Sequence, residues 1–357
     1  MVNFIDASEW TELFWYNSGG TRAKRILQAP TGEEWFFKCS EKKPAKDGKA
    51  EKYYKYEFWS EVIAFQVGKE LGLNILRYEP AINNNEIGCI SPLMIKRDEE
   101  QLLEVGRYMT ALNPNFLPED TKTRTEYTFE LLKDTLIEFK QEKYWGTFFC
   151  TILFDAIIGN TDRHQENWAF IGKASFISKV FDEMEKEVKD KGLKKQPWII
   201  RNTYGRFFDK EKLTLNNLGQ QIKLEQTSIL KMAPIYDNGS SLARELNDER
   251  VDKILNDNNL LNNYIEKGPA EIHWNKAKIS HFKLIENLLN SSYLDEIRKA
   301  AAFLDNWNHT TIEEIINNID ASVPDNWASY RIPQSRKQLI IKLLHLRFEK
   351  VKRLING

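Results

Sequence analysis

The stretch that decides the fold is Gly159–Asn167, which reads GNTDRHQEN. It directly follows an apolar segment, Phe148–Ile158. It places Asp162 five residues before Asn167, next to an arginine and a histidine. A second acidic turn, Tyr236–Ser241 (YDNGSS), lies further along the chain. Carboxylate and amide oxygens in such turns are suited to hold a hard cation, and a carboxylate can also accept a proton.

The spacing within the first turn is that of a kinase catalytic loop, in which the Asp takes the proton of the acceptor hydroxyl and the Asn holds magnesium. We therefore predict Asp162 as the base and Asn167 as one metal ligand, with Asp237 of the second turn as the other. Arg163 and His164 are candidate catalytic-loop residues that hold the loop or meet phosphate. Each turn alone has a plainer interpretation, as a polar helix cap or an ordinary Asp-Asn-Gly hairpin turn. Together they favour phosphoryl transfer from ATP.

The composition is that of an ordinary globular protein with a near-neutral charge. The 357 residues carry 51 Lys and Arg against 52 Asp and Glu, so no global field that would attract nucleic acid or a membrane is expected. The three cysteines have neither pairing nor metal-ligand spacing, which fits a reducing compartment. The sequence has no recognisable signal peptide and no apolar run of bilayer length. We therefore expect a cytoplasmic protein, with export by an unrecognised signal as the alternative.

Strand-like segments come first in the chain and helical segments follow. Residues 13–40 and 76–95 have strand propensity and tight turns, and a helix is predicted between them, from residue 56 to 71. We therefore predict an α+β, bilobal protein-kinase-like fold, with a small strand-rich N-lobe at 1–95 and a larger helical C-lobe at 96–357. ATP would lie in the cleft between the lobes. Further helices are predicted at 129–141, 145–158, 279–290, 293–304, 311–318 and 336–355, with a loop or a frayed helix end at the Asn-rich residues 255–263.

Lys38 lies in an otherwise aromatic strand and is the candidate ATP lysine. If this strand lines the cleft, the ammonium group reaches the nucleotide phosphates. Glu61 is its predicted partner, because it shares a helix face with Phe58 and Phe65 that should be buried, and a buried carboxylate needs a cation. The alternatives are a Glu61 that stays in water at the margin of that face, and a pairing of Lys38 with Glu57.

A glycine-containing loop near the N-terminus is a candidate phosphate-binding loop. Its backbone amides and basic side chains would supply positive potential. The pattern is neither the Walker motif nor the full protein-kinase glycine motif, and an ordinary solvated turn is the alternative. The candidate residues are Ser18, Gly19, Gly20, Thr21, Arg22 and Lys24.

These motifs together make the chain similar to the HipA-like kinase family, bacterial serine/threonine kinases that are distantly similar to phosphatidylinositol kinases. The resemblance is carried by Asn160–Trp168 and Pro234–Leu242. Ser18–Lys24 resembles the phosphate-loop region of the family, and Ser60–Leu73 resembles its front-lobe helix. The similarity covers about residues 13–95 and 140–245.

The resemblance implies roles and cofactors for the candidate residues. Asp162 would be the catalytic base, Asn167 and Asp237 the ligands of Mg²⁺, and Lys38 the lysine that binds ATP. About 70 residues separate the two motifs, more than the catalytic machinery needs, so we expect an insertion at 174–230. We also expect that the extra N-terminal domain of the longer family members is missing.

The family suggests partners and a mode of regulation. Its members include toxins of toxin–antitoxin pairs that phosphorylate aminoacyl-tRNA synthetases, and a secreted pro-inflammatory kinase. The expected substrate is thus a protein with a Ser or Thr acceptor, with an antitoxin as a candidate partner and no direct nucleic-acid or membrane ligand. The phosphate-loop region can be self-phosphorylated in this family, so Ser18 or Thr21 is a candidate site of modification that lowers ATP affinity.

Three other functions are compatible with the same motifs. A phosphoinositide-type lipid kinase has a similar catalytic loop, although the sequence has no evident basic and aromatic membrane face. A nucleotide-binding pseudokinase or interaction module would not need all four of Lys38, Asp162, Asn167 and Asp237. Adenylyl transfer, with ATP reversed in the cleft, cannot be separated from phosphorylation by sequence.

Overall fold

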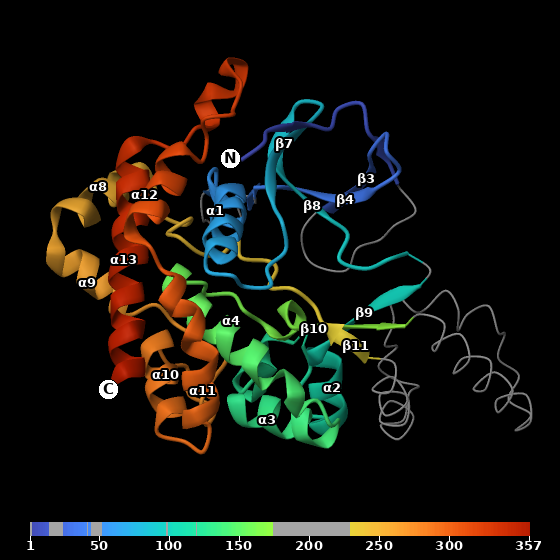
Figure 1. The fold of residues 1–357 in the computed structure, drawn as a ribbon, viewed down its shortest axis with the longest axis vertical. Helices are drawn as coiled ribbons and strands as arrows, with labels where there is room; N and C mark the ends of the chain where they lie inside the picture. Colours follow the sequence, from blue (N-terminus) through green and yellow to red (C-terminus); the bar gives the residue numbers. More distant parts are fainter. Residues whose placement is uncertain are drawn as a thin grey trace, which may run out of the picture.

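The structure is a computed structural model that describes residues 2–13, 24–40, 42–43, 52–97, 99–118, 120–173 and 229–357. Strands of the N-terminal part form a small front lobe, and most helices gather in a larger back lobe (Figure 1). This arrangement confirms the predicted α+β, bilobal kinase-like fold. None of the described helices combines the length and the hydropathy needed to cross a bilayer.

The front lobe is built on a six-stranded sheet in the order β1-β7-β8-β4-β3-β2, in which only the β1–β7 pair is parallel. Successive side chains of a strand point to opposite faces of a sheet. Phe37 therefore packs into a small core on one face, with Leu27 and Ile90, while the next residue, Lys38, points to the other face. The strands are β1 (Ile5–Asp6), β2 (Thr11–Glu12), β3 (Lys24–Gln28), β4 (Glu34–Cys39), β7 (Glu79–Asn83) and β8 (Glu86–Pro92), and β5 (Lys42–Lys43) pairs separately with β6 (Lys52–Tyr53).

Helix α1 (Glu57–Glu70) lies between the sheet and the back lobe (Figure 1). It contacts β7 and β8 on one side and α12 on another. Eleven of its 14 residues are buried. More of the helix surface is therefore buried than the single face that the sequence predicts. Trp59 donates to the carbonyl of Tyr330, and Asn306 donates to the carbonyl of Leu71, which ties the helix to the C-terminal segments. Helix α1 is thus fixed to both lobes.

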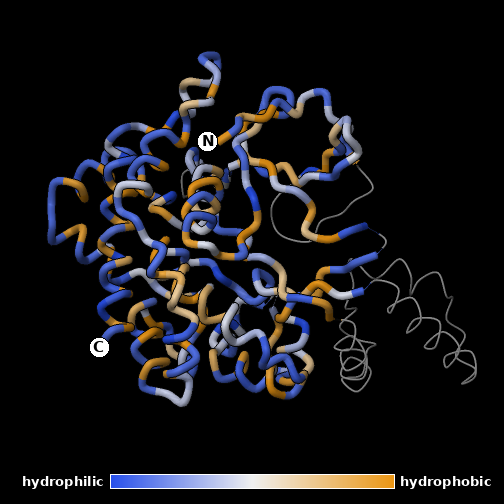
Figure 2. Tube along the Cα trace, in the orientation of Figure 1, coloured by the Kyte–Doolittle hydropathy of each residue, from blue (hydrophilic) through white to orange (hydrophobic). Residues whose placement is uncertain are grey.

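The back lobe surrounds α4 (Trp145–Ile158), which is packed against α10, α11 and α13. Its apolar residues produce a helix that is buried over most of its length, with the bounds predicted from sequence. In Figure 2 the other back-lobe helices alternate between hydrophobic and hydrophilic colours, as amphipathic helices should. These helices are α2 (Val105–Leu112), α3 (Phe129–Glu138), α8 (Asp248–Asn256), α9 (Asn258–Glu266), α10 (His281–Leu289), α11 (Leu294–Ala300), α12 (His309–Asn318) and α13 (Gln334–Asn356).

A three-stranded antiparallel sheet lies at the edge of the back lobe in the order β11-β10-β9 (Figure 1). It consists of β9 (Glu100–Glu104), β10 (Ala169–Lys173) and β11 (Ile229–Met232). The catalytic-loop candidate lies between α4 and β10, and the second acidic turn follows β11. The sheet therefore brings the two predicted motifs to the same place.

The prediction of a loop or frayed end at 255–263 is wrong. This segment forms the end of α8 and most of α9. Asn has a low helix propensity, but Asp257 caps α9 by accepting from the backbone N–H groups of Asn259 and Leu260. Leu261 and Ile265 are buried in the main core, and this burial outweighs the propensity.

Several predicted segments fall largely outside the described residues. Of the candidate phosphate loop, only Lys24 is described, as the first residue of β3. Ser18, Gly19, Gly20, Thr21 and Arg22 lie outside the described residues, as do residues 174–228 of the predicted insertion. The last two positions of that predicted insertion, 229 and 230, belong to β11.

Candidate active site

Lys38 is positioned by β4 and bridges two carboxylates. Its Nζ lies 2.5 Å from Oε1 of Glu61 and 2.5 Å from Oδ1 of Asp237. The predicted pair between the strand and α1 is therefore present. Glu57, the alternative partner considered from sequence, instead forms an ion pair with Arg244.

Glu61 is fully buried, and both of its oxygens have a partner. Oε1 binds Lys38, and Oε2 accepts the backbone N–H of Asn238 at 2.7 Å. Burial raises the pKa of the Glu61 carboxyl, against the lowering effect of the Lys38 ammonium, while Asp237 raises it further. The carboxylate thus joins the strand lysine to the acidic turn.

The acidic turn has a shape that the sequence does not suggest. An ordinary Asp-Asn-Gly hairpin turn was the plainer interpretation of this segment, but the residue with a left-handed backbone is Asp237, with φ of 56°. Gly239 is needed for space instead, because a Cβ there would lie 3.1 Å from Oε1 of Glu61 and 3.4 Å from Glu57. The turn packs against α1, and the carboxylate of Asp237 contacts Lys38.

The catalytic-loop candidate begins where α4 ends, at Gly159 with φ of 67°. The side chain of Asn160 accepts from the backbone N–H of Asp162 at 3.2 Å. Asn167 donates through Nδ2 to the Asp162 carbonyl at 2.8 Å, which closes the loop on itself. Ser240 of the acidic turn donates to Oδ2 of Asp162 at 3.2 Å. Asp162 and the acidic turn therefore meet in one site.

Arg163 is buried and holds the loop in place. It forms two hydrogen bonds of 2.9 Å with the carboxylate of Asp155 and one of 2.6 Å with Oδ1 of Asn238, and it donates to the carbonyl of Tyr236. Burial alone would lower the pKa of the Arg163 guanidinium, but the charge and hydrogen bonds of Asp155, with Asp237 and Tyr236 nearby, together outweigh burial, and the pKa is raised. The sequence suggested that Arg163 either holds the loop or contacts phosphate, and these contacts support the first role.

Asp155 is a residue of the candidate site that sequence reasoning missed. It lies inside the apolar helix α4, where a carboxylate must have a cation. That lone charge in an apolar run was the available signal. His164, the other candidate of the loop, accepts through Nδ1 from the backbone N–H of Glu166 and so caps the short helical turn Gln165–Asn167.

The oxygen donors of the site suit magnesium. Within the described ranges, no cluster of three or more His, Cys, Asp or Glu side chains has the arrangement of a metal site. Magnesium at phosphoryl-transfer sites, however, is held by one or two protein carboxylates together with substrate phosphates and water. Asp237 supplies a carboxylate that is a quarter exposed. Because the Nδ2 of Asn167 is used inside the loop, its Oδ1 is the atom left for a cation.

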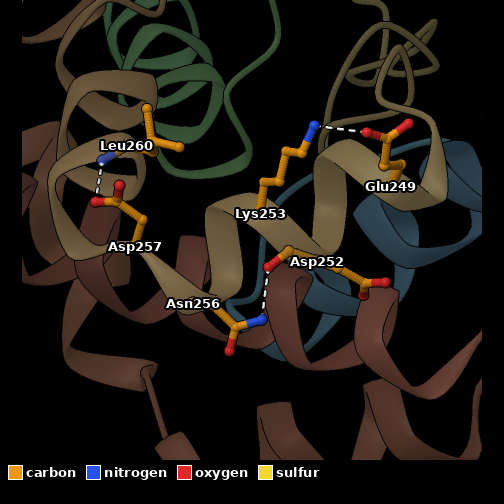
Figure 3. Close-up of a pocket in the computed structure, with 6 residues that line it drawn as sticks. All are labelled: Glu249, Asp252, Lys253, Asn256, Asp257 and Leu260. Atoms are coloured by element: carbon orange, nitrogen blue, oxygen red, sulfur yellow. Dashed lines mark hydrogen bonds and ion pairs between the residues drawn. The ribbon is translucent and has the colours of Figure 1, made fainter.

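A surface depression between α8 and α9 is not part of this site (Figure 3). Lys253 is paired with Glu249, and the carboxylate of Asp257 caps α9. The depression is shallow, and these charged groups stabilise the two helices. Its lining residues are Glu249, Asp252, Lys253, Asn256, Asp257 and Leu260.

Comparison with known proteins identifies a shared fold. No family model matches the chain, and no curated protein matches it in sequence. Among solved structures, the proinflammatory kinase CtkA of Helicobacter pylori is similar, with a TM-score of 0.67 and 16% sequence identity. The match covers 99% of this chain and 98% of that one. The chain therefore shares the fold of that kinase.

Proposed function

We propose that the protein is a kinase that uses ATP and Mg²⁺ to phosphorylate Ser or Thr residues of a protein. The observation that carries this proposal is the bridge from Lys38 to Glu61 and Asp237, with Asp162 hydrogen-bonded to the same acidic turn. A strand lysine, its helix glutamate, a metal-binding Asp and a base are the parts that phosphoryl transfer needs. The shared fold with a bacterial kinase supports it.

Each residue has a role in the proposed reaction. The ammonium of Lys38 contacts the ATP phosphates. Asp237 and Asn167 would hold magnesium, which would supply positive charge beside the phosphates. Asp162 accepts the proton of the acceptor hydroxyl as its oxygen bonds to the γ-phosphorus. The bond from that phosphorus to the bridging oxygen breaks, and ADP leaves with the electron pair.

The bridge between Lys38 and Asp237 changes when ATP binds. Two carboxylates share the ammonium group of Lys38. With Mg-ATP bound, Asp237 would turn to the metal and Lys38 would turn to the phosphates, so that each group faces an opposite charge. Glu61 keeps Lys38 in place during this exchange through its second bond, to Asn238.

Labelled ATP tests the proposal and separates the alternatives. The purified protein is incubated with Mg²⁺, a mixed protein acceptor, phosphatidylinositol vesicles, and ATP labelled on either the γ or the α phosphate. Label from the γ position in protein, on Ser or Thr, supports the proposal. Label from the α position indicates adenylyl transfer, and label in lipid indicates a lipid kinase. Nucleotide binding without transfer would identify a binding module, and the absence of both would refute the proposal.

Self-phosphorylation is a finer part of the same proposal. Ser18 and Thr21 precede basic residues in the candidate phosphate loop, outside the described residues. A phosphate there would add about −1.5 to −2 charge and compete with ATP for the same cations. Peptide mass spectrometry after incubation with Mg-ATP, with Asp162→Ala as the inactive control, tests it. An unmodified loop in an active enzyme would reject this part alone.

A further inference from the structure

A chain of hydrogen bonds joins the carboxylate of Asp162 to the first turn of α1. Ser240 donates to Oδ2 of Asp162 at 3.2 Å. Nη2 of Arg244 donates to Oγ of Ser240 at 2.8 Å. Nη1 of the same guanidinium lies 2.5 Å from Oε1 of Glu57, at the start of α1. We call these residues, Glu57, Arg244, Ser240 and Asp162, the relay.

The direction of the relay follows from the chemistry of its members. Arginine has only donors, so the hydroxyl oxygen of Ser240 must accept from Arg244. The single O–H of Ser240 can then donate a hydrogen bond to Asp162. This bond occupies Oδ2, and within the described part of the chain Oδ1 of Asp162 accepts no hydrogen bond. The relay therefore leaves one defined oxygen of the carboxylate for an acceptor hydroxyl.

The relay needs an arginine. Its planar fork contacts Glu57 and Ser240 with different nitrogens, which a lysine cannot do in one fixed geometry. The guanidinium also lies over the ring of Tyr54, 4.5 Å from its centroid. Glu57 is 1% exposed and the Arg244 side chain 12% exposed, so the pair is largely screened from water. Such a pair fixes position more firmly than a surface ion pair.

Helix α1 is joined to the acidic turn by two further contacts. Glu61 accepts the N–H of Asn238 at 2.7 Å, and Ser60 donates to the carbonyl of Ser241 at 3.0 Å. Glu61 also holds Lys38. The same helix thus positions the lysine directly and the carboxylate of Asp162 through Arg244.

We propose that Arg244 and Ser240 are positioning residues that orient Asp162 toward the acceptor hydroxyl and make this orientation depend on the position of α1. The proposal rests on the proposed kinase function. Neither residue contacts the reacting atoms.

Steady-state kinetics of variants tests the proposal. Ser240→Ala removes the donor to Asp162, so kcat should fall about tenfold, while KM for ATP should stay within about twofold. Ser240→Thr keeps the hydroxyl and should recover most of kcat. Arg244→Lys keeps the charge beside Glu57 without the fork and should resemble Ser240→Ala. A wild-type kcat in Ser240→Ala, or an equal rise in KM, would overturn the proposal.

A matched control separates positioning from stability. Thr135→Ala removes another buried hydroxyl, which donates within α3 to the carbonyl of Leu131 at 2.7 Å, away from the site. Its kcat should equal the wild-type value, and its loss in melting temperature measures the general cost of such a change. If Thr135→Ala lowers kcat as much as Ser240→Ala, the effect of the latter is structural and the proposal fails.

A double-mutant cycle, measured as free energies of unfolding, tests the relay independently of activity. Ser240→Ala, Asp162→Ala and the double variant are unfolded by denaturant. The relay predicts that the double variant loses less stability than the sum of the two single losses. Additive losses would overturn the relay even in an active kinase. An absence of phosphoryl transfer in the wild type would refute the proposed function, while the cycle would still test the relay.

Discussion

Lys38 and Arg163 lie on two sides of the same acidic turn, and their surroundings differ. Arg163 pairs with one carboxylate, Asp155, and both side chains are 4% exposed. Lys38 pairs with two carboxylates, and one of them, Asp237, is 25% exposed. The Arg163 pair is neutral and shielded from water, whereas the Lys38 cluster contains two carboxylates, one of which is partly exposed.

This difference separates residues that stabilise the fold from residues of the proposed reaction centre. A closed, neutral pair with all its hydrogen bonds made has no reason to rearrange. In the Lys38 cluster, the partly exposed carboxylate of Asp237 can change partner when a cation binds. We therefore expect substitutions around Arg163 to affect stability and substitutions around Lys38 to affect nucleotide chemistry.

The largest expected effects are on activity, at Asp162 and Asp237. Each change to Ala should reduce phosphoryl transfer by about three to four orders of magnitude, about 4–5 kcal/mol, with the fold intact. Asp237→Ala should also weaken binding of Mg-ATP, because it removes a metal ligand, whereas Asp162→Ala should largely spare it. Calorimetric titration with a non-hydrolysable ATP analogue measures the distinction. Activity near the wild-type level in either variant would exclude its assigned role.

Arg163→Met should cause the largest loss of stability. It leaves Asp155 buried without a cation, so the free energy of unfolding should fall by at least about 3 kcal/mol. The matched control is Arg331→Met, which breaks an exposed pair with Asp325 and should cost about 1 kcal/mol or less. Denaturant unfolding measures both. Equal costs would mean that burial does not distinguish the two pairs.

Lys38→Met should lower phosphoryl transfer about a hundredfold, about 2.7 kcal/mol, with a smaller loss of stability than Arg163→Met. The reason is that Glu61 can take up a proton. Its pKa is already raised by burial, and removal of Lys38 would raise it further. A carboxyl with a raised folded pKa destabilises the protein as pH rises above its unfolded value, 4.5. The variant should therefore be closer to wild type in stability at pH 5 than at pH 8, and a pH-independent difference would contradict this.

The smallest electrostatic effect at neutral pH is expected at His281, because its contribution to stability changes only as the pH falls. This histidine is buried, and burial, with Arg347 and Arg163 nearby, lowers its pKa to about 3, against the raising effect of the Asn160 backbone. Between that value and 6.5 the unfolded chain binds a proton that the folded chain does not. Stability should therefore fall as pH drops through this window, with a contribution of up to about 1.4 kcal/mol per pH unit.

His281→Asn should flatten that part of the stability profile, measured by denaturant unfolding between pH 4 and pH 7. The control is His309→Gln, at an exposed histidine paired with Glu349. An unchanged slope in His281→Asn would show that other groups cause the dependence.

The sequence alone determined the features that depend on local periodicity and spacing. The strand alternation that turns Lys38 away from Phe37, and the helical spacing that turns Glu61 inward, are encoded within a few residues. The bounds of α4 follow from one apolar run that ends at a glycine. The spacing from Asp162 to Asn167 is likewise visible in a single short segment.

Only the tertiary structure decided which distant groups meet. Arg163 binds Asn238, Ser240 binds Asp162, and Arg244 binds Glu57. These contacts join residues that are 75, 78 and 187 positions apart, so no local pattern encodes them. In the same way, burial against the core made helices of the Asn-rich residues 255–263, although their propensity favoured a loop. Local propensity fixes the elements, whereas the requirement to bury charges in pairs fixes how the two lobes and their loops are joined.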